Sequence, residues 1–246
     1  MKNLLTKIGK KSKEAFFDKL SSKKKDKVLK DYYNLIDKNR KLIINENKKD
    51  IKNAYKKKIK INLIERLILD NKKISNIISS IKKIIKLKDP TNIVLDSWKR
   101  PNGLSISKVS IPIGVIGIIY ESRPNVTSDV ASLCFKSGNA AILKGGSEAF
   151  YSNLILSKLF RKSLRKNNIN ENFVQFINIK NRKVVDYLLK NMNKFIDVII
   201  PRGGKKLVKK VQNLSSVPTI GHLEGICHSY VDKDANPQIA KKVINN

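Results

Sequence analysis

Three short polar turns carry the side chains that could do chemistry in this sequence, and each follows an apolar run of strand length. The first is Glu121-Ser122-Arg123-Pro124-Asn125. Asn125 could cap the helix that starts here, or its amide could donate to an oxygen that gains negative charge during a reaction. Arg123 could bind a carboxylate or a phosphate through two parallel hydrogen bonds. The pattern alone favours the helix cap for Asn125, and both interpretations stay open.

The second turn joins a buried strand to a helix and reads Lys144-Gly145-Gly146-Ser147. It combines a positive charge, backbone that a ligand can approach closely, and a serine able to cap the next helix. That combination is typical of an anion-binding site. It is not a Walker A loop, because no Gly-Lys-Ser/Thr follows the glycines. The alternative is an ordinary tight turn with an exposed lysine.

The third turn is Pro201-Arg202-Gly203-Gly204, and two lysines follow it. Glycines at the start of a helix let a pyrophosphate approach the backbone, and the lysines add favourable charge. Taken as a pattern alone, this turn is a weak signal.

The two histidines and one of the two cysteines lie in one short segment, as His222, Cys227 and His228. A metal site needs three or four convergent ligands, and a strand at 226–231 would send Cys227 and His228 to opposite faces. We therefore predict no metal site, and a Cys–His nucleophilic pair is supported just as weakly. Cys134 lies on the apolar side of a helix, where we expect it to be buried as a small hydrophobic residue.

The elements around the turns alternate between strand and helix patterns. The predicted strands are Val115–Tyr120, Ala140–Lys144, Phe173–Ile177, Ile196–Ile200 and Ile226–Val231, with helices near 126–137, 148–166, 181–192 and 204–214. This order predicts an α/β fold with a Rossmann-type, mostly parallel sheet covered by helices on both faces. Ligands bind at the carboxyl ends of strands in such sheets, which is where the polar turns lie.

The first 112 residues have other patterns. Apolar residues recur at three- and four-residue spacing through 1–88, which predicts helices that end at Asp89-Pro90. Residues 93–112 alternate around the turn Pro101-Asn102-Gly103, which predicts a β-hairpin. The sequence therefore predicts an N-terminal helical segment over 1–92, followed by a hairpin arm.

The chain of 246 residues has a formal net charge of +32, and lysine carries nearly all of it, with 44 Lys against 8 Arg. Abundant Lys, Ile and Asn fit A/T-rich codon usage, and arginine, the better ligand for phosphates and bases, is scarce. We predict no specific nucleic-acid partner, although a basic polyanion-binding protein stays the alternative from another class. No signal peptide, membrane span or disulfide framework is evident, so we expect a cytoplasmic protein without a membrane partner.

The segment from Ile111 to Glu148, IPIGVIGIIYESRPNVTSDVASLCFKSGNAAILKGGSE, closely resembles the gamma-glutamyl phosphate reductase (glutamate-5-semialdehyde dehydrogenase) family of the aldehyde dehydrogenase superfamily. IPRGG at 200–204 and GHLEGICHSYVD at 221–232 resemble the same family. The resemblance implies an aldehyde-dehydrogenase-like fold. It also implies NADPH-dependent reduction of gamma-glutamyl phosphate to glutamate 5-semialdehyde and phosphate, a step of proline biosynthesis, through a cysteine thioester.

The resemblance also implies roles for single residues. Asn125 would donate to the oxyanion of the thiol adduct, Arg123 would bind the substrate, and Lys144 would bond the adenosine ribose. The remaining expected cofactor residues are Gly145, Gly146 and Ser147, which would leave room for the ribose 2′-phosphate, and Pro201, Arg202, Gly203 and Gly204, which would form the pyrophosphate-binding turn. The family's general-base glutamate is not clearly matched, because Glu224 is out of register.

The resemblance divides the chain into parts. Residues 93–112 would be an oligomerisation arm of a homo-oligomer, and residues 113–232 the dinucleotide-binding core. Residues 233–246 would begin a truncated catalytic domain, with the catalytic cysteine expected just beyond Asn246. Two expectations follow, a fragment of a full enzyme or a catalytically inactive NADPH-binding relic.

Overall fold

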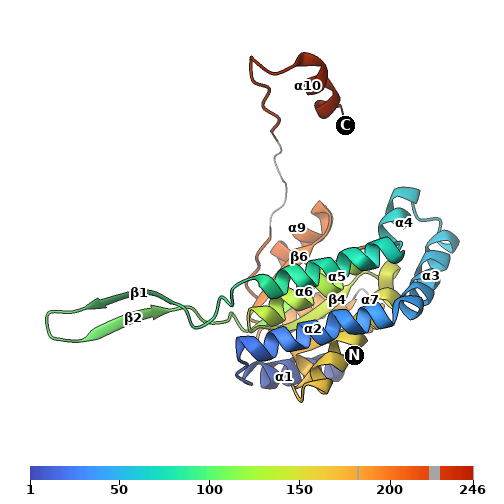
Figure 1. Cartoon of the computed structure of the whole chain (residues 1–246). Helices are drawn as coiled ribbons and strands as arrows, with labels where there is room; N and C mark the ends of the chain where they lie inside the picture. Colours follow the sequence, from blue (N-terminus) through green and yellow to red (C-terminus); the bar gives the residue numbers. More distant parts are fainter. Residues whose placement is uncertain (182, 222–227, 246) are drawn as a thin grey trace.

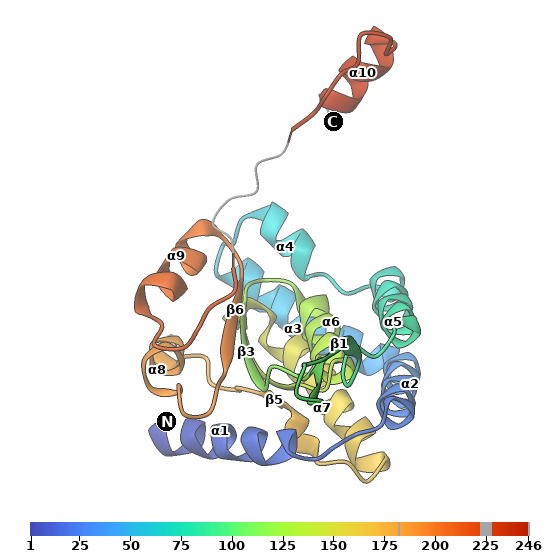
Figure 2. The same ribbon diagram turned by 90° about the vertical axis from the view of Figure 1, so that its left-hand side faces the viewer.

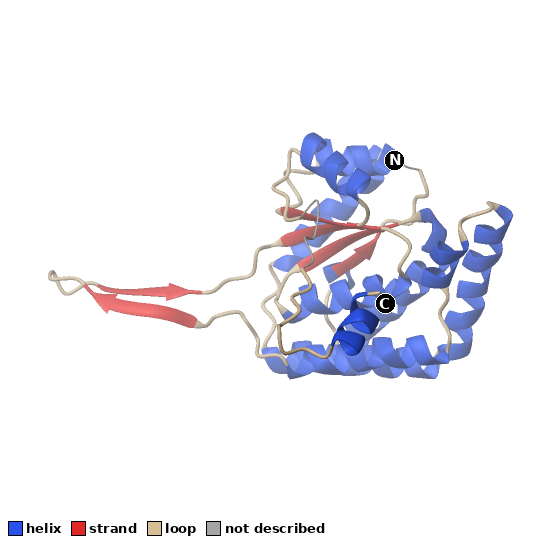
Figure 3. Cartoon of the chain, turned by 90° about the horizontal axis from the view of Figure 1, so that it is seen from above, coloured by secondary structure: helices blue, strands red, loops and turns tan. Residues whose placement is uncertain are grey.

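The computed structural model describes residues 1–181, 183–221 and 228–245. Its centre is a parallel sheet of four strands in the spatial order β5-β4-β3-β6. The strands are β3 (Val115–Tyr120), β4 (Ala140–Gly145), β5 (Val174–Phe176) and β6 (Val198–Arg202). Figure 3 shows the sheet edge-on between layers of helix. The predicted α/β fold with a parallel sheet is confirmed.

The two central strands, β3 and β4, are buried along their whole length. Helices cover both faces of the sheet, so these strands are continuously apolar instead of alternating. The outer strands differ from their predicted ranges. β5 is shortened by a 3-10 turn, η2 (Glu171–Phe173), and β6 starts at Val198 and continues to Arg202, because its pairing with β3 reaches Tyr120.

The connections place helices on both faces of the sheet (Figure 2). Helices α6 (Pro124–Lys136) and α7 (Phe150–Lys166) lead from β3 to β4 and from β4 to β5, while α8 (Lys183–Asn191) returns to β6 and α9 (Lys205–Leu214) follows it. Right-handed crossovers in opposite directions along a sheet put their helices on opposite faces. Helix α1 (Lys2–Phe16) joins the α8 side, where Gly9 packs closely against Phe195 and Met192.

The rest of the predicted helical segment forms a further layer. It consists of α2 (Ser22–Lys38), α3 (Arg40–Lys56), α4 (Ile61–Leu67) and α5 (Asn71–Lys86). Helices α2, α3 and α5 pack on α6 and α7. Ser21 caps α2 through the amide of Lys24, and Asp70 caps α5 through the amide of Lys73.

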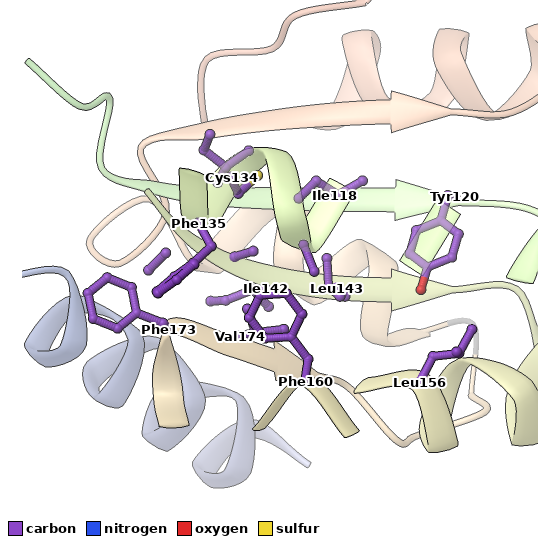
Figure 4. Packing of buried hydrophobic residues seen from close by; sticks show 14 of the residues in the cluster. Ile118, Tyr120, Cys134, Phe135, Ile142, Leu143, Leu156, Phe160, Phe173 and Val174 are labelled. Atoms are coloured by element: carbon purple, nitrogen blue, oxygen red, sulfur yellow. The ribbon is translucent and has the colours of Figure 1, made fainter. Parts of the chain in front are cut away.

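Aromatic rings join the helical layers to the sheet (Figure 4). Phe135 of α6 meets Phe160 and Phe173 edge to face, with ring centroids 5.7 and 5.5 Å apart. Tyr32 of α2 lies 4.5 Å from Phe160, centroid to centroid, and its hydroxyl lies 2.7 Å from the Ser128 hydroxyl. All these rings are fully buried, so α2 is anchored to the same core as the sheet.

The predicted hairpin is confirmed as β1 (Val94–Lys99) and β2 (Ser105–Val109), which pair antiparallel. Gly103 closes the turn at a φ of +84°, which a residue with a Cβ rarely adopts. The hairpin projects from the body (Figure 1), and most of its side chains are exposed.

The fifth predicted strand, 226–231, is wrong where it can be checked. Residues 228–231 form no strand, and Tyr230 is 86% exposed, because no element of the described chain packs against this run. Residues 226 and 227 lie outside the described residues. Helix α10 (Pro237–Ile244) follows, lies apart from the sheet in Figure 1 and contains no buried residue. None of the helices in the described ranges is long and apolar enough to cross a bilayer.

Candidate functional site

The three polar turns start side by side, because the last residues of their strands share one row of the sheet. Tyr120 pairs with Gly145 on one side and with Arg202 on the other. In an open parallel sheet the carboxyl edge is where ligands bind. Sequence reasoning placed each turn at the end of its strand, and the strand order now brings all three together.

Two cavities of about 360 Å³ each open on this edge, and Glu121 lines both of them. The first, which we call the lysine cavity, is lined by the second turn and by Lys144, Lys180, Lys206 and Lys210. The second, the arginine cavity, is lined by the first and third turns and by Arg66, Arg123 and Arg202. Together they form one cationic groove along the edge of the sheet.

Lys144 is the most enclosed cation of the groove, with 7% of its surface exposed. Its ammonium donates to the carbonyl oxygen of Gly145 at 2.8 Å. Burial lowers the pKa of Lys144 below 10.5, against the opposing influence of the Glu148 carboxylate. The side chain therefore reaches the cavity wall with donor capacity to spare, because an ammonium carries three hydrogens.

The expected helix cap at Ser147 is wrong. Ser147 starts a 3-10 turn, η1 (Ser147–Ala149), and its hydroxyl donates to Glu148 at 3.0 Å instead of capping α7. The first-turn amides of α7, at Tyr151 and Ser152, donate to the buried carboxylate of Asp50 at 3.0 and 2.8 Å. Because Asp50 already accepts from these amides, they are not available to an anion, and the positive charge in the lysine cavity comes from its lysines.

The third turn leads into α9, and its glycines lie against Glu121. A Cβ on Gly203 would lie 2.6 Å from the Glu121 carboxylate, and the Gly204 amide donates to that carboxylate at 2.8 Å. The expected anion position at the start of α9 is therefore filled by a side chain of the first turn. No local pattern indicated this contact, which joins residues 83 positions apart.

Asn125 does not cap α6, so the interpretation that its pattern favoured is wrong. The helix begins at Pro124, and Asn125 donates from Nδ2 to Oδ2 of Asp129 at 3.0 Å. Thr127, in the first turn of α6, is buried and bonds to Tyr120 and Asn153. The amide of Asn125 is exposed at the edge of a third cavity.

The third cavity, which we call the α5 cavity, has a volume of about 400 Å³ and lies between α5 and the start of α6. Its charged and polar lining consists of Arg66, Lys73, Asn76, Ser80, Arg123, Asn125 and Asp129. Arg66 and Arg123 also line the arginine cavity, so the two spaces adjoin at these guanidinium groups. Arg66, Lys73 and Asn76 come from the N-terminal helices, where no motif pointed to them.

Cys134 is buried, as expected, and burial raises the pKa of its thiol to about 12. A thiol with such a pKa is protonated and unreactive near neutral pH. His222, Glu224 and Cys227 lie outside the described residues, and His228 is exposed. Within the described part of the chain, no group of three His, Cys, Asp or Glu side chains could hold a metal ion.

Comparison with known proteins adds a family to this geometry. The gamma-glutamyl phosphate reductase of Nautilia profundicola is 47% identical over 227 residues, which are 92% of this chain and 55% of that protein. The crystal structure of the Thermotoga maritima gamma-glutamyl phosphate reductase has a TM-score of 0.85 at 38% identity, over 87% of this chain and 52% of that one. No family model matches the sequence.

A more distant likeness concerns the fold alone. A probable aldehyde dehydrogenase from Listeria monocytogenes has a TM-score of 0.63 at 18% identity, covering 90% of this chain and 45% of that one. The chain spans about half the length of the curated relatives it matches. Sequence and structure agree over nearly all of these 246 residues, so the chain belongs to the gamma-glutamyl phosphate reductase family.

Proposed function

We propose that this chain forms the dinucleotide-binding part of an NADPH-dependent reductase. The reaction converts gamma-glutamyl phosphate to glutamate 5-semialdehyde and phosphate in proline biosynthesis. The observation that carries the proposal is the shared row of Tyr120, Gly145 and Arg202, from which three ligand-binding turns emerge around one cationic groove. The names of the similar reductases supply the substrate class.

The lysine cavity fits the adenosine end of NADPH. Its four lysines favour a dinucleotide with an added ribose phosphate over NADH, because the extra phosphate meets positive charge. Leu207 and Val185 offer apolar surface to the adenine, and Lys144 can donate to a ribose hydroxyl. The backbone at Gly146 lies close to Glu148, since an added Cβ would lie 2.5 Å from the Glu148 carboxylate.

The arginine cavity fits the pyrophosphate and the nicotinamide end. Gly203 and Gly204 bring the backbone of the α9 start to the cavity wall, and Arg202 adds a guanidinium group. The Glu121 carboxylate has to leave the Gly204 amide before a phosphate oxygen can take its place. When bound, NADPH supplies a hydride to the acyl carbon of the substrate.

Asn125 and Arg123 act at the reacting end of the substrate. The Nδ2 group of Asn125 has two hydrogens, and the bond to Asp129 uses one of them. The other can donate to the carbonyl oxygen as that oxygen gains charge, an interaction that lowers a barrier by up to ~3 kcal/mol. Arg123 has no side-chain partner among the described residues, and it can bind the leaving phosphate.

The acyl transfer also needs a thiolate, which Cys134 cannot supply because its thiol is buried and protonated. We propose that the reacting cysteine belongs to the part of such reductases that this chain does not span. The thiolate attacks the acyl carbon, the bond to the phosphate oxygen breaks, and phosphate leaves with the electron pair. The residues of this chain bind and orient both reactants.

The test is a fluorescence titration of NADPH into the 246-residue chain at moderate salt. We expect saturable binding, with NADH weaker by about ten-fold because one phosphate–lysine interaction is lost. Lys144→Met should weaken the binding of NADPH by a similar factor. Lys41→Met is the matched control, because Lys41 is exposed on α3, away from the groove. Unchanged binding in the Lys144 variant would reject the assignment of this cavity.

The titration also separates this proposal from a polyanion-binding protein with the same fold. If heparin displaces NADPH fully, and Lys41→Met weakens binding as much as Lys144→Met does, the attraction is general and the reductase-type site is rejected. Binding that resists heparin and depends on Lys144 supports a built site.

We propose further that the hairpin over residues 93–112 is an oligomerisation arm. Two strands alone are marginally stable in water, and β1 and β2 present unpaired edges with exposed apolar side chains, among them Leu95 and Trp98. A second copy of the chain could cover them. Analytical ultracentrifugation should show an oligomer that Trp98→Glu dissociates, whereas Phe17→Glu, at a more exposed aromatic residue outside the hairpin, should have no effect.

A further inference from the structure

The α5 cavity differs from the other two in the charges that line it. Asp129 is the single carboxylate among the described residues around it, and Arg66, Lys73 and Arg123 are its cations. A cavity for a simple anion would need no carboxylate, because a negative charge repels the ligand. A ligand with both an ammonium and an anionic group would use both kinds of side chain.

The carboxylate of Asp129 has unused acceptor capacity. Ser80 donates to Oδ1 at 2.9 Å and Asn125 donates to Oδ2 at 3.0 Å. Each carboxylate oxygen can accept two hydrogen bonds, so one position on each stays open. These two bonds also hold the half-buried carboxylate between α5 and α6, where it lines the cavity.

The cations are placed to bind anions. No described residue pairs with the guanidinium of Arg66 or of Arg123, although Arg40, Arg161 and Arg165 each have a carboxylate partner. Lys73 donates from Nζ to the carbonyl oxygen of Glu65 at 2.7 Å and keeps two hydrogens for a ligand. Arg66, the residue after Glu65 in α4, lines the same cavity as Lys73.

We propose that the α5 cavity binds the amino-acid end of the substrate, with Asp129 as the acceptor for the α-ammonium group and Arg66 with Lys73 as donors to the α-carboxylate. This inference rests on the proposed function, which places the acyl phosphate beside Asn125 and Arg123. Asp129 and Arg66 would then set the specificity for an α-amino acid over a plain dicarboxylic acid.

The test compares three small ligands on the full 246-residue chain by isothermal titration calorimetry. The ligands are L-glutamate, glutarate, which lacks the α-amino group, and 4-aminobutyrate, which lacks the α-carboxylate. The wild-type chain should bind L-glutamate about ten-fold tighter than either of the others, because each lacks one charged hydrogen-bonding group.

Asp129→Asn should change the affinities for L-glutamate and for glutarate in opposite directions. L-glutamate should bind about ten-fold weaker because its ammonium loses a charged partner, and glutarate should bind tighter because a repelling carboxylate is gone. A merely structural Asp129 would weaken both ligands together. Asp18→Asn is the matched control, since it makes the same change of charge at an exposed residue outside the α5 cavity, and it should preserve the preference for L-glutamate.

Three results would overturn the inference. They are equal affinity of the wild type for L-glutamate and glutarate, parallel losses in Asp129→Asn, and no binding of any of the three ligands. NADPH is titrated into the same wild-type sample. If NADPH binds and L-glutamate is not preferred, the inference alone fails, whereas absence of NADPH binding is a failure of the proposed function.

Discussion

The carboxylate of Glu121 accepts a hydrogen bond from the backbone amide of Gly204, with 2.8 Å between Oε2 and N. This contact ties the first turn to the third, across the paired strands β3 and β6. It also puts a negative charge at the N-terminus of α9, where the positive end of the helix dipole attracts anions. A pyrophosphate and the Glu121 side chain cannot occupy that place together, so Glu121 competes with the proposed cofactor.

Glu121→Gln should therefore raise the affinity for NADPH. The amide side chain keeps its shape, but it binds the Gly204 amide more weakly and no longer repels phosphate. Because the variant loses the charge-assisted bond to the Gly204 amide, we expect its affinity for NADPH to be about five-fold higher in a fluorescence titration. Glu14→Gln makes the same change of charge on α1, away from the groove, and should alter affinity far less. Weaker binding in the Glu121 variant would show that this carboxylate helps to hold the cofactor.

Lys144 predicts a pH dependence of cofactor binding. Burial lowers its pKa below the ordinary 10.5, so it loses its proton at a lower pH than the exposed lysines do. NADPH affinity should fall as the pH rises through this lowered pKa. Lys144→Arg keeps its proton over this range, so its titrations should show a flatter profile. Equal profiles for the two proteins would contradict a role for the Lys144 charge.

The lowered pKa of Lys144 has the opposite effect on stability: the free energy of unfolding rises with pH, whereas the affinity for NADPH falls. Between the lowered pKa of Lys144 and 10.5 the unfolded chain binds the proton and the folded chain does not, so stability rises with pH in that window. At neutral pH the protonated lysine is therefore a cost to the fold. Lys144→Met should raise the free energy of urea unfolding at pH 7, although it weakens the binding of NADPH. A lower free energy of unfolding in this variant at pH 7 would contradict the conclusion that the protonated Lys144 destabilises the fold.

The parts of the fold that the sequence predicts well are those set by local pattern. The run VIGIIY at 115–120 is apolar at every position and forms a strand with those bounds, and the turn at 101–103 closes the expected hairpin. The parallel order of the strands then places the three turns on one edge. The spacing of apolar residues and the residue types found in turns are local properties, so a single sequence is enough to detect them.

The parts that the sequence does not predict depend on residues far apart in the chain. Serine is a residue type that commonly caps helices, and Ser147 precedes α7. However, the amides at the start of α7 donate to Asp50, about one hundred positions earlier in the chain. Glu121 reaches Gly204 in the same way. The α5 cavity, our proposed substrate site, is lined by Arg66 and Lys73, which in sequence are two of many basic residues on amphipathic helices. Their importance follows from which helices pack beside α6.

Gly145 and Gly146 form a matched pair for testing the packing of the second turn. A Cβ on Gly145 would lie 2.3 Å from Nδ2 of Asn153 and 3.0 Å from the Tyr120 ring, and both side chains are buried. Gly145→Ala should therefore reduce the free energy of urea unfolding by ~1–3 kcal/mol. At Gly146 the close atom is the end of the flexible Glu148 side chain, so Gly146→Ala should cost less than about 0.5 kcal/mol. Equal losses would contradict the packing at Gly145.

The ion pair of Lys25 and Asp89 predicts a pH-dependent part of the stability. The Lys25 side chain is 2% exposed, and its Nζ lies 2.5 Å from Oδ2 of Asp89, which joins α2 to the segment before the hairpin. Partial burial raises the pKa of Asp89, but the bonds from Lys25 and Thr91 outweigh it and hold the pKa below 3.8. The stabilisation is therefore fully present above pH 3.8 and is lost as the pH falls through the lowered pKa.

Lys25→Met removes one partner of this nearly buried pair and leaves the Asp89 charge without its ammonium. We expect a loss of ~2–3 kcal/mol in the free energy of urea unfolding at pH 7. The difference from wild type should shrink as Asp89 becomes protonated in both proteins at lower pH. In an Asp89→Asn background the same lysine substitution should have little pH dependence. A loss that stays constant from pH 7 down through the titration of Asp89 would show that Lys25 stabilises the fold by packing and not by its charge.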